Sequence, residues 1–490
     1  MPKRTSQFAR TAAIVALVTA LCGCSVGPDF TPPDPHLPEK SFFGRPEPAT
    51  LEPDRPPSLD AQWWRQFKDP TLGSLIERVA EVNLDVRMAT ERLWESRAQR
   101  NAAASALLPT VNGSAQYTRE LMSQNGLIAL GTAFNQGRPL PYIPAFSLWQ
   151  TGFDASWEID LWGHVRRQVE SAQAQVESSE FQARDTLIAT IAELARDYAE
   201  LRGAEAQIAI TKANLASAEE ILDLTKTRAQ GGVVTYLDVE NAAAQVESTR
   251  AQLPPLISQE SALIDAIGRL LDQPPQALRG ELAHTGPQLF TPPRPPVGLA
   301  SELARRRPDI RRAEADLHAA TANIGVAVAE FYPTFKFNGS LGFNALDAKK
   351  LFEKTSLQYQ IGPSLTVPIF DAGRLKSQLE LRDAQAREAA IAYHKTVLTA
   401  WTEVVDAIVA YRAEEARHAR VKAQAAHQRE ALALARARYK TGVSPFINVL
   451  DAQRSALQAE LQEAQSRTTV ATNFVTLYKA LGGGWEETLP

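Results

Sequence analysis

The sequence predicts a mainly α-helical chain that contains two copies of one structural unit and a smaller β portion. Residues 145–253 and 369–444 contain no proline, which is typical of unusually long helices. Four short segments alternate apolar and polar residues, as strands do. Seven residues of the first half recur in the second with a constant offset of 210: Gly152, Gly163, Arg202, Glu205, Arg228, Gly232 and Val239 recur as Gly362, Gly373, Arg412, Glu415, Arg438, Gly442 and Val449.

The N-terminus has the pattern of an export signal, residues 1–23. Basic residues precede an apolar run from Thr11 to Leu21, which is too short to span a bilayer. The run ends in Leu21-Cys22-Gly23-Cys24, which resembles the cleavage and acylation motif of bacterial lipoproteins. We expect a covalent lipid on Cys24, and the alternative is an ordinary secretory signal. Because Cys22 and Cys24 are the only cysteines, the processed chain has no intramolecular disulfide.

Residues 24–61 are predicted to form an extended strap, because ten prolines lie between positions 28 and 57. The first repeat, residues 62–272, follows. Its expected order is helix, strand, strand, long helix, tip and returning helix, at residues 63–106 with a break at 83–85, 110–122, 146–157, 163–229, 230–235 and 236–271. At 1.5 Å per residue, the long helix measures about 100 Å if it is continuous.

The long helix also carries a seven-residue repeat of apolar residues, which predicts left-handed coiled-coil packing. These residues are Leu187, Leu194, Leu201, Ile208, Leu215 and Leu222. A proline-rich crossing, 273–298, leads to the second repeat, 299–484, in which Pro308 suits the first position of a helix. The remaining expected features are strands 334–344 and 357–368, a long helix, a tip at 440–446, a last helix and a tail at 485–490.

The strands leave two interpretations open. Residues 335–344 and 358–367 place phenylalanine, leucine, isoleucine and valine on one face, and lysine, asparagine, glutamine and serine on the other. One interpretation is a soluble sheet over a helical core. The other is a membrane barrel with its apolar face toward lipid. Four strands cannot close a barrel, and an open edge in lipid leaves backbone groups unpaired, so several chains have to pool their strands. A water-filled lumen favours three or more chains.

Composition and motifs exclude several function classes. The net charge of −4 and the absence of a clustered basic face argue against nucleic acid. The seven histidines are dispersed, and no pair has metal-ligand spacing. The glycines at 482–484 neither follow a strand nor open a helix, so they are no phosphate loop. We therefore expect no enzyme, no metal and no cofactor other than the lipid.

Three segments resemble a known family, the TolC/OprM-type outer-membrane efflux factors, in the lipoprotein branch that serves resistance-nodulation-division (RND) pumps. They are residues 24–30 (CSVGPDF), residues 307–333 from Arg-Pro-Asp-Ile-Arg to Glu-Phe-Tyr-Pro, and residues 477–485 (LYKALGGGW). The resemblance implies a homotrimer with one twelve-stranded barrel in the outer membrane, to which each chain contributes four strands. It also implies a long α-helical barrel in the periplasm.

The resemblance further implies that the two tips meet a periplasmic adaptor, at Gly231, Gly232, Val233, Gly442, Val443 and Ser444. Behind the second tip, Ile447, Asn448 and Asp451 would form rings that close the tunnel. Tyr439 and Asp238 occupy the positions that tie adjacent helices together, so we expect a hydrogen bond between them to hold the closed state. The alternative for Asp451 is a solvated carboxylate near the positive end of a helix.

The resemblance implies a passive exit duct that releases solutes expelled by an inner-membrane RND pump through a periplasmic adaptor. Export of protein or metal ions is an alternative cargo. An acylated periplasmic coiled-coil scaffold without a pore is an alternative of another class.

Overall fold

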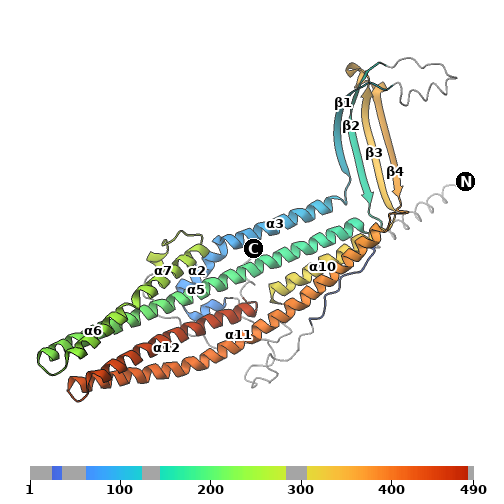
Figure 1. Ribbon diagram of the computed structural model, residues 1–490. Helices are drawn as coiled ribbons and strands as arrows, with labels where there is room; N and C mark the ends of the chain where they lie inside the picture. Colours follow the sequence, from blue (N-terminus) through green and yellow to red (C-terminus); the bar gives the residue numbers. More distant parts are fainter. Residues whose placement is uncertain (1–24, 36–61, 124–143, 283–305, 484–490) are drawn as a thin grey trace, which may run out of the picture. The chain divides into compact units, whose positions relative to one another are not determined.

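A computed structural model describes residues 25–35, 62–123, 144–282 and 306–483 (Figure 1). The expected signal peptide, Cys24, most of the strap, most of the crossing and the C-terminal tail lie outside these ranges. So does most of the segment between the first two strands, residues 124–143.

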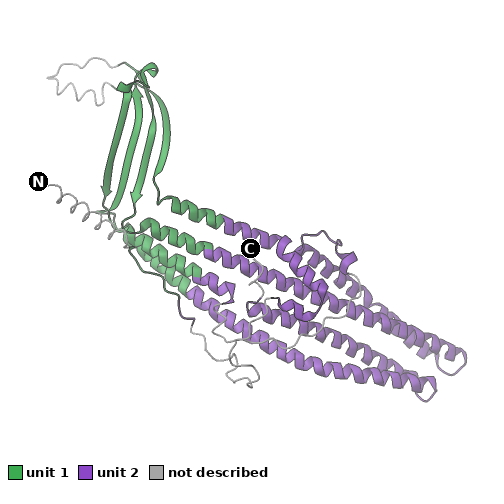
Figure 2. Ribbon diagram, turned by 180° about the vertical axis from the view of Figure 1, so that it is seen from behind, with its two compact units in different colours: residues 1–32, 95–176, 315–390 green, residues 33–94, 177–314, 391–490 purple. Residues whose placement is uncertain are grey.

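The chain divides into two compact units, and each unit contains parts of both repeats (Figure 2). Unit 1 comprises residues 1–32, 95–176 and 315–390, and unit 2 comprises residues 33–94, 177–314 and 391–490. Each of the two sequence repeats is therefore divided between the two units. The physical reason is strand pairing, because the second strand of the first repeat bonds to the first strand of the second repeat.

Unit 1 contains one antiparallel sheet with the order β1-β2-β3-β4. Its strands are β1 (Thr110–Glu120), β2 (Phe146–Ile159), β3 (Thr334–Ala345) and β4 (Leu357–Thr366). These bounds differ from the expected ones by no more than two residues. Within the described chain, β1 and β4 are edge strands whose outer backbone groups have no strand partner.

The two faces of the sheet differ in chemistry. Residues directly opposite in an antiparallel pair share a face, so Phe153 lies with Leu341, and Asp154 lies with Ser340. On the polar face, Ser156 also donates a hydrogen bond to Asn338, with 3.0 Å between oxygens. On the apolar face, Phe153 is 64% exposed and Leu341 is 53% exposed. Among the described residues nothing buries that face, so the interpretation of a sheet over a helical core fails.

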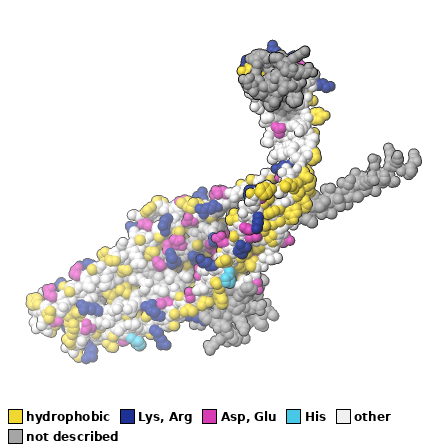
Figure 3. Space-filling model, turned by 45° about the vertical axis from the view of Figure 1, so that its right-hand side comes forward, with side chains coloured by type: hydrophobic (Ala, Val, Ile, Leu, Met, Phe, Trp, Pro, Cys, Tyr) yellow, Lys and Arg dark blue, Asp and Glu magenta, His cyan; other side chains and the backbone are white. Residues whose placement is uncertain are grey.

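Large apolar side chains are also exposed at one end of the sheet in unit 1, just before β1 and β3 and just after β4. We call this set the interface belt: Leu107, Leu108, Phe331, Tyr332, Ile369 and Phe370. Hydrophobic side chains gather at this end of the strands in Figure 3. Ile369 and Phe370 are 88% and 89% exposed, which is unusual for residues of this size. Apolar and aromatic belts of this kind flank the membrane-spanning part of β-sheet channels.

Long helices make up most of the remaining chain. The helical elements of the first repeat are η1 (Trp63–Phe67), α2 (Pro70–Val82), α3 (Leu84–Ser105), α5 (His164–Gln230), α6 (Tyr236–Arg250) and α7 (Leu253–Leu270). Those of the second are α10 (Pro308–Ala329), η2 (Ala348–Lys350), η3 (Lys354–Ser356), α11 (Arg374–Lys440) and α12 (Phe446–Ala480). The short helix α8 (Arg279–Leu282) lies in the proline-rich crossing. Helices α5 and α11 contain 67 residues each.

The returning helix of the first repeat, expected to run unbroken from Tyr236 to Leu271, is instead two helices. It ends at Arg250 as α6 and resumes at Leu253 as α7. Pro254 and Pro255 explain the break, because proline lacks the amide hydrogen that continues a helix and clashes with the preceding turn. The second repeat has no proline at the matching place, and α12 runs through.

The core of unit 2 is an aromatic and aliphatic cluster. The ring of Trp63 stacks on Tyr478 with 5.5 Å between centroids, and Phe67 packs edge-on against Phe474 at 5.3 Å. Of the predicted heptad residues, Leu187, Leu194, Leu201 and Ile208 are buried, as the coiled-coil pattern predicts. Leu215 and Leu222, which lie nearer the tip, are half-buried.

A polar network lies beside this core. Tyr198 donates to the Asp69 carboxylate at 2.8 Å and accepts from Arg202 at 2.9 Å. Arg202 also pairs with Glu205 at 2.7 Å. Asp69 in turn caps the N-terminus of α2 through Thr71. Arg202 and Glu205, which the sequence identified only as repeated residues, therefore form a buried ion pair in α5.

In the described ranges, no helix has both the length and the hydropathy that crossing a membrane requires.

Candidate gate at the helix tips

Each long helix ends at a glycine turn in unit 2. After α5 the turn contains Gly232 with φ of +72°, and after α11 the equivalent Gly442 has φ of +78°. Both values lie in the left-handed region that side chains disfavour, so glycine is required there. The next helices begin differently. Thr235 and Asp238 form a reciprocal capping box at the start of α6, whereas Pro445 precedes α12 without a side-chain cap.

Both turns expose apolar side chains. Val233 and Val443 are 70% and 67% exposed, so the expected contact residues of the two tips lie at the surface of the described chain. Ser444 accepts a hydrogen bond from the Asn448 side chain at 2.9 Å. Sequence reasoning missed Tyr236 and Leu237, which are 76% and 68% exposed. An apolar pair directly inside a capping box was the available signal.

Behind the turns, Arg228 of α5 holds the end of α11. Its guanidinium donates to the backbone carbonyls of Tyr439 and Lys440, at 2.7 and 2.8 Å. It also lies over the Tyr439 ring, 4.5 Å from the centroid. The last carbonyls of a helix lack intrahelical partners and carry partial negative charge, so a cation is favoured there. We call this contact the tip clamp.

The tip clamp covers a small apolar cluster. Its buried members are Ile221, Ala242, Tyr439, Phe446, Val449 and Leu450. The Tyr439 ring is 2% exposed and packs 5.8 Å from the Phe446 ring. The sequence identified Arg228 only as a residue that recurs as Arg438. That recurrence was the one sequence feature that could have indicated a role for Arg228 at the tip. Arg438 forms no side-chain hydrogen bond or ion pair within the described residues.

The expected hydrogen bond between Tyr439 and Asp238 does not form within the chain. The Tyr439 hydroxyl lies 3.4 Å from the Thr225 hydroxyl, in a buried position. The Asp238 carboxylate instead accepts from the Thr235 hydroxyl at 2.9 Å and from the Thr235 amide at 3.1 Å. The capping box thus engages the carboxylate locally, and ring packing directs the phenol toward α5.

The three expected ring residues share one side of α12. Ile447 is 49% exposed, and Asn448 and Asp451 are also exposed. Residues three and four apart are neighbours on a helix surface, so these side chains form one patch. Val449 and Leu450 face the core instead. The patch is therefore free to face a lumen or a second chain.

Among the described residues, no group of three or more histidine, cysteine, aspartate or glutamate side chains has the arrangement of a metal site. Cys24, the expected lipid attachment point, lies outside the described ranges.

Paired long helices with glycine tips, joined to a sheet whose apolar face is open, define the class of outer-membrane channel proteins with periplasmic helical tubes. A family model described as outer membrane efflux protein matches residues 75–261 and 299–483. The chain belongs to this family and is an outer-membrane efflux channel protein.

Relatives and solved structures agree with this assignment. Nodulation protein T of Rhizobium leguminosarum bv. viciae is 31% identical over 478 residues, which cover 98% of this chain and 94% of that protein. Outer membrane protein OprJ of Pseudomonas aeruginosa is 31% identical over 491 residues, covering 99% and 97%. The outer-membrane channel OprN is 32% identical with a TM-score of 0.84, covering 94% of this chain and 100% of that one. The Neisseria gonorrhoeae MtrE channel, solved in its open state, is 28% identical with a TM-score of 0.80, covering 95% and 100%. The predicted resemblance to the TolC/OprM-type family is confirmed.

Proposed function

We propose that three copies of the chain form the exit duct of a tripartite efflux system. The observation that carries the proposal is the open four-stranded sheet with one apolar face. In lipid, the free edges of β1 and β4 have to be paired, because unsatisfied backbone groups there cost several kcal/mol each. Three copies supply about twelve strands, enough to surround a water-filled lumen lined by the polar face.

Native mass spectrometry of the detergent-solubilised protein tests the copy number, and planar-bilayer recordings test the pore. We expect a trimer and discrete conductance steps. A stable dimer or monomer contradicts the closed barrel. A trimer without conductance favours the alternative of an acylated periplasmic scaffold.

We propose that the two tip turns dock a periplasmic adaptor, which connects the duct to an inner-membrane RND pump. Exposed Val233, Tyr236 and Leu237 on the first tip and Val443 on the second support this, since exposed apolar side chains mark protein contacts. Val233→Asp with Val443→Asp should abolish adaptor capture in a pull-down and leave the trimer intact. Asn448→Asp, on the neighbouring α12 patch, is the matched acidic control.

We propose that the tip turns also form the gate. Opening would separate the α5 end from the α11 end, and the tip clamp of Arg228 opposes that separation. The repeat suggests that Arg438 makes the equivalent contact with the α5 end of a neighbouring copy. Rings of Ile447 and Asp451 would then narrow the lumen of the closed state.

The cargo and the lipid anchor are further parts of the proposal. Relatives carry names such as toluene efflux pump outer membrane protein TtgF and pyoverdine export outer membrane protein OpmQ, both of Pseudomonas putida. Their diversity supports a duct whose cargo is chosen by the pump, and small organic solutes are the class we propose. Mass spectrometry of the N-terminal peptide tests acylation of Cys24, and an unmodified thiol would contradict it.

A further inference from the structure

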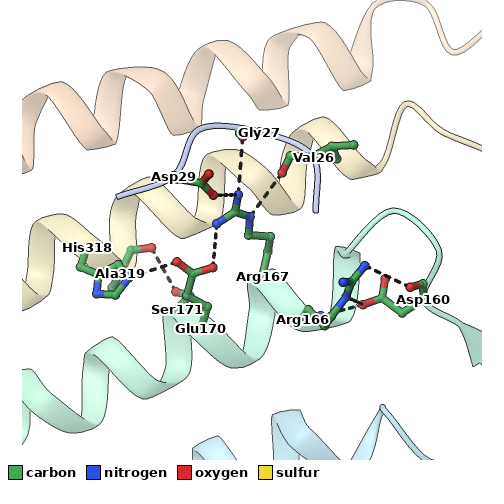
Figure 4. Close-up of polar contacts among 10 residues, drawn as sticks. All are labelled: Val26, Gly27, Asp29, Asp160, Arg166, Arg167, Glu170, Ser171, His318 and Ala319. Carbon is green, nitrogen blue, oxygen red and sulfur yellow. Dashed lines mark hydrogen bonds and ion pairs between the residues drawn. The ribbon is translucent and has the colours of Figure 1, made fainter. Parts of the chain in front are cut away.

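The segment directly after Cys24 is fixed against the rest of unit 1. Residues 25–30 run beside the start of α5 and along α10 (Figure 4). The Val26 amide donates to the Trp162 carbonyl at 3.0 Å. Phe30 stacks on the ring of His318 in α10, with 4.4 Å between centroids and an angle of 15°. This short stretch therefore contacts both repeats.

Arg167 is the centre of this contact. Its side chain is only 4% exposed. It donates to the carbonyls of Val26 and Gly27, at 3.3 and 3.5 Å, and to the Asp29 carboxylate at 2.6 Å. It also donates to Glu170 at 2.8 Å. A guanidinium offers five N–H donors in a fixed fork, and here most of them bind the segment.

Charge and shape both favour this arrangement. Burial on its own lowers the pKa of Arg167, but the hydrogen bonds to Asp29 and Glu170 more than offset it, so the pKa is raised above the ordinary arginine value. Gly27 has φ of +90°, and a Cβ added there would lie 2.5 Å from the Cα of Gly325 in α10. Two glycine backbones thus meet where no side chain fits.

The clamped segment lies beside the interface belt. Trp162, whose carbonyl binds Val26, stacks its ring on belt residue Tyr332 at 4.8 Å. The Trp162 indole also donates to the Pro333 carbonyl at 2.8 Å, at the start of β3. The chain position next to Cys24 is therefore held at the end of the strands that carries exposed aromatic and aliphatic side chains.

We propose that Arg167 is a positioning residue that clamps the segment after lipidated Cys24, so that the acyl chains enter the membrane directly beside the belt. The inference rests on the proposed acylation. Once the segment is released, the lipid is joined to the helices only through the strap, residues 24–61. An extended strap of that length reaches roughly 110 Å at about 3.1 Å per residue. A long tether lowers the effective concentration of the strands at the membrane, and the clamp raises it.

The test separates positioning from a purely structural role. Arg167→Ala releases the segment. A 15-residue glycine–serine insertion between Ser25 and Val26 keeps the clamp intact but separates it from the lipid. We expect each change to slow the appearance of outer-membrane trimer at least threefold after a short induction. The combination should be no slower than either alone. Arg167→Lys, which keeps the charge without the fork, should lie between wild type and Arg167→Ala.

Two matched controls should assemble at the wild-type rate. Arg166→Ala removes the adjacent arginine, which bonds Asp160 in the preceding turn. The same insertion placed between Asp34 and Pro35 lengthens the strap after the clamped segment. If Arg167→Ala misfolds, Gly27→Ala releases the segment from the strap side. Hydrogen exchange at the Val26 amide reports the release directly, and its protection should be lost in both variants.

Three outcomes would overturn the inference. If the insertion leaves the rate of trimer assembly unchanged while Arg167→Ala lowers it, the clamp only ties α5 to α10. Normal assembly of Arg167→Ala with an unprotected Val26 amide would show that the clamp has no role in assembly. An unmodified Cys24 in the wild-type protein would remove the lipid anchor and the inference together, whereas an acylated Cys24 with either of the first two results leaves the exit duct standing.

Discussion

Removing the tip clamp should shift the gate toward its open state. Arg228→Ala deletes two hydrogen bonds from an ionised donor and one cation–π contact. Charge-assisted hydrogen bonds contribute about 1.5–3 kcal/mol each when sheltered from water. The bond to Lys440 is exposed, so about 1 kcal/mol per bond is a fairer value, and the ring contact adds roughly 0.5 kcal/mol at such a site. The sum is about 2.5 kcal/mol per chain.

That free energy corresponds to roughly a 70-fold change in the ratio of open to closed tips for each chain, since about 1.36 kcal/mol is a factor of ten. The assay is the open probability of single channels in planar bilayers. Uptake of a large antibiotic by cells that lack the pump provides a second reading. Arg228→Lys should recover part of the effect, because a single ammonium cannot bond both carbonyls in the same way.

Lys226→Ala is the matched control, because Lys226 lies on the same helical turn and pairs only loosely with Asp223, at 3.8 Å. An open probability for Arg228→Ala within twofold of wild type would refute the gating role of the clamp. A large and equal change in both variants would mean that any loss of positive charge at the α5 end opens the tips.

Four further results are expected. Arg438→Ala should raise the open probability about as much as Arg228→Ala if the repeat equivalence extends between copies, and no change would exclude that contact. Tyr439→Phe should raise the open probability by no more than about threefold, because it removes one 3.4 Å contact worth roughly 0.5 kcal/mol. Tyr439→Ala should open the channel, because it removes the ring as well. Burial raises the pKa of Tyr198 to about 12. The stability that this shift contributes is therefore fully present below about pH 10 and is lost as the pH rises to 12. Thermal melting followed by the helical signal should show a fall in melting temperature over this pH range, and Tyr198→Phe should lack that fall. Gly342→Ala should sharply reduce assembled trimer on a semi-native gel, because its Cβ would lie 2.5 Å from the Thr151 carbonyl.

The periodicity of apolar residues in the sequence predicted most of the fold. The alternation in residues 335–344 and 358–367 determines the facing of β3 and β4, and the seven-residue repeat from Leu187 to Ile208 identifies the buried side of α5. Both patterns depend on local geometry, so the sequence contains them directly. The division into units was not accessible in this way, because it depends on the pairing of β2 with β3 across nearly 200 residues.

The gate was only partly predictable for a related reason. The glycine turns have a local cause and were found. The partner of Tyr439 is set by how α5 and α11 pack, and by competition from Thr235, which captures Asp238 within its own helical turn. Arg228 was visible as a repeated residue, but its acceptors are backbone carbonyls, which no side-chain pattern reveals.

The equal lengths of α5 and α11 restrict how this chain can change over generations. Both helices contain 67 residues, and both of their ends obey the offset of 210. Deleting one residue from either helix draws its tip back by about 1.5 Å and turns everything beyond the deletion by about 100°. Such a change would separate Arg228 from the carbonyls of Tyr439 and Lys440. It would also turn the buried apolar side of the helix away from the helices that it packs against. Length variants of this channel should therefore arise in matched pairs, one in each repeat.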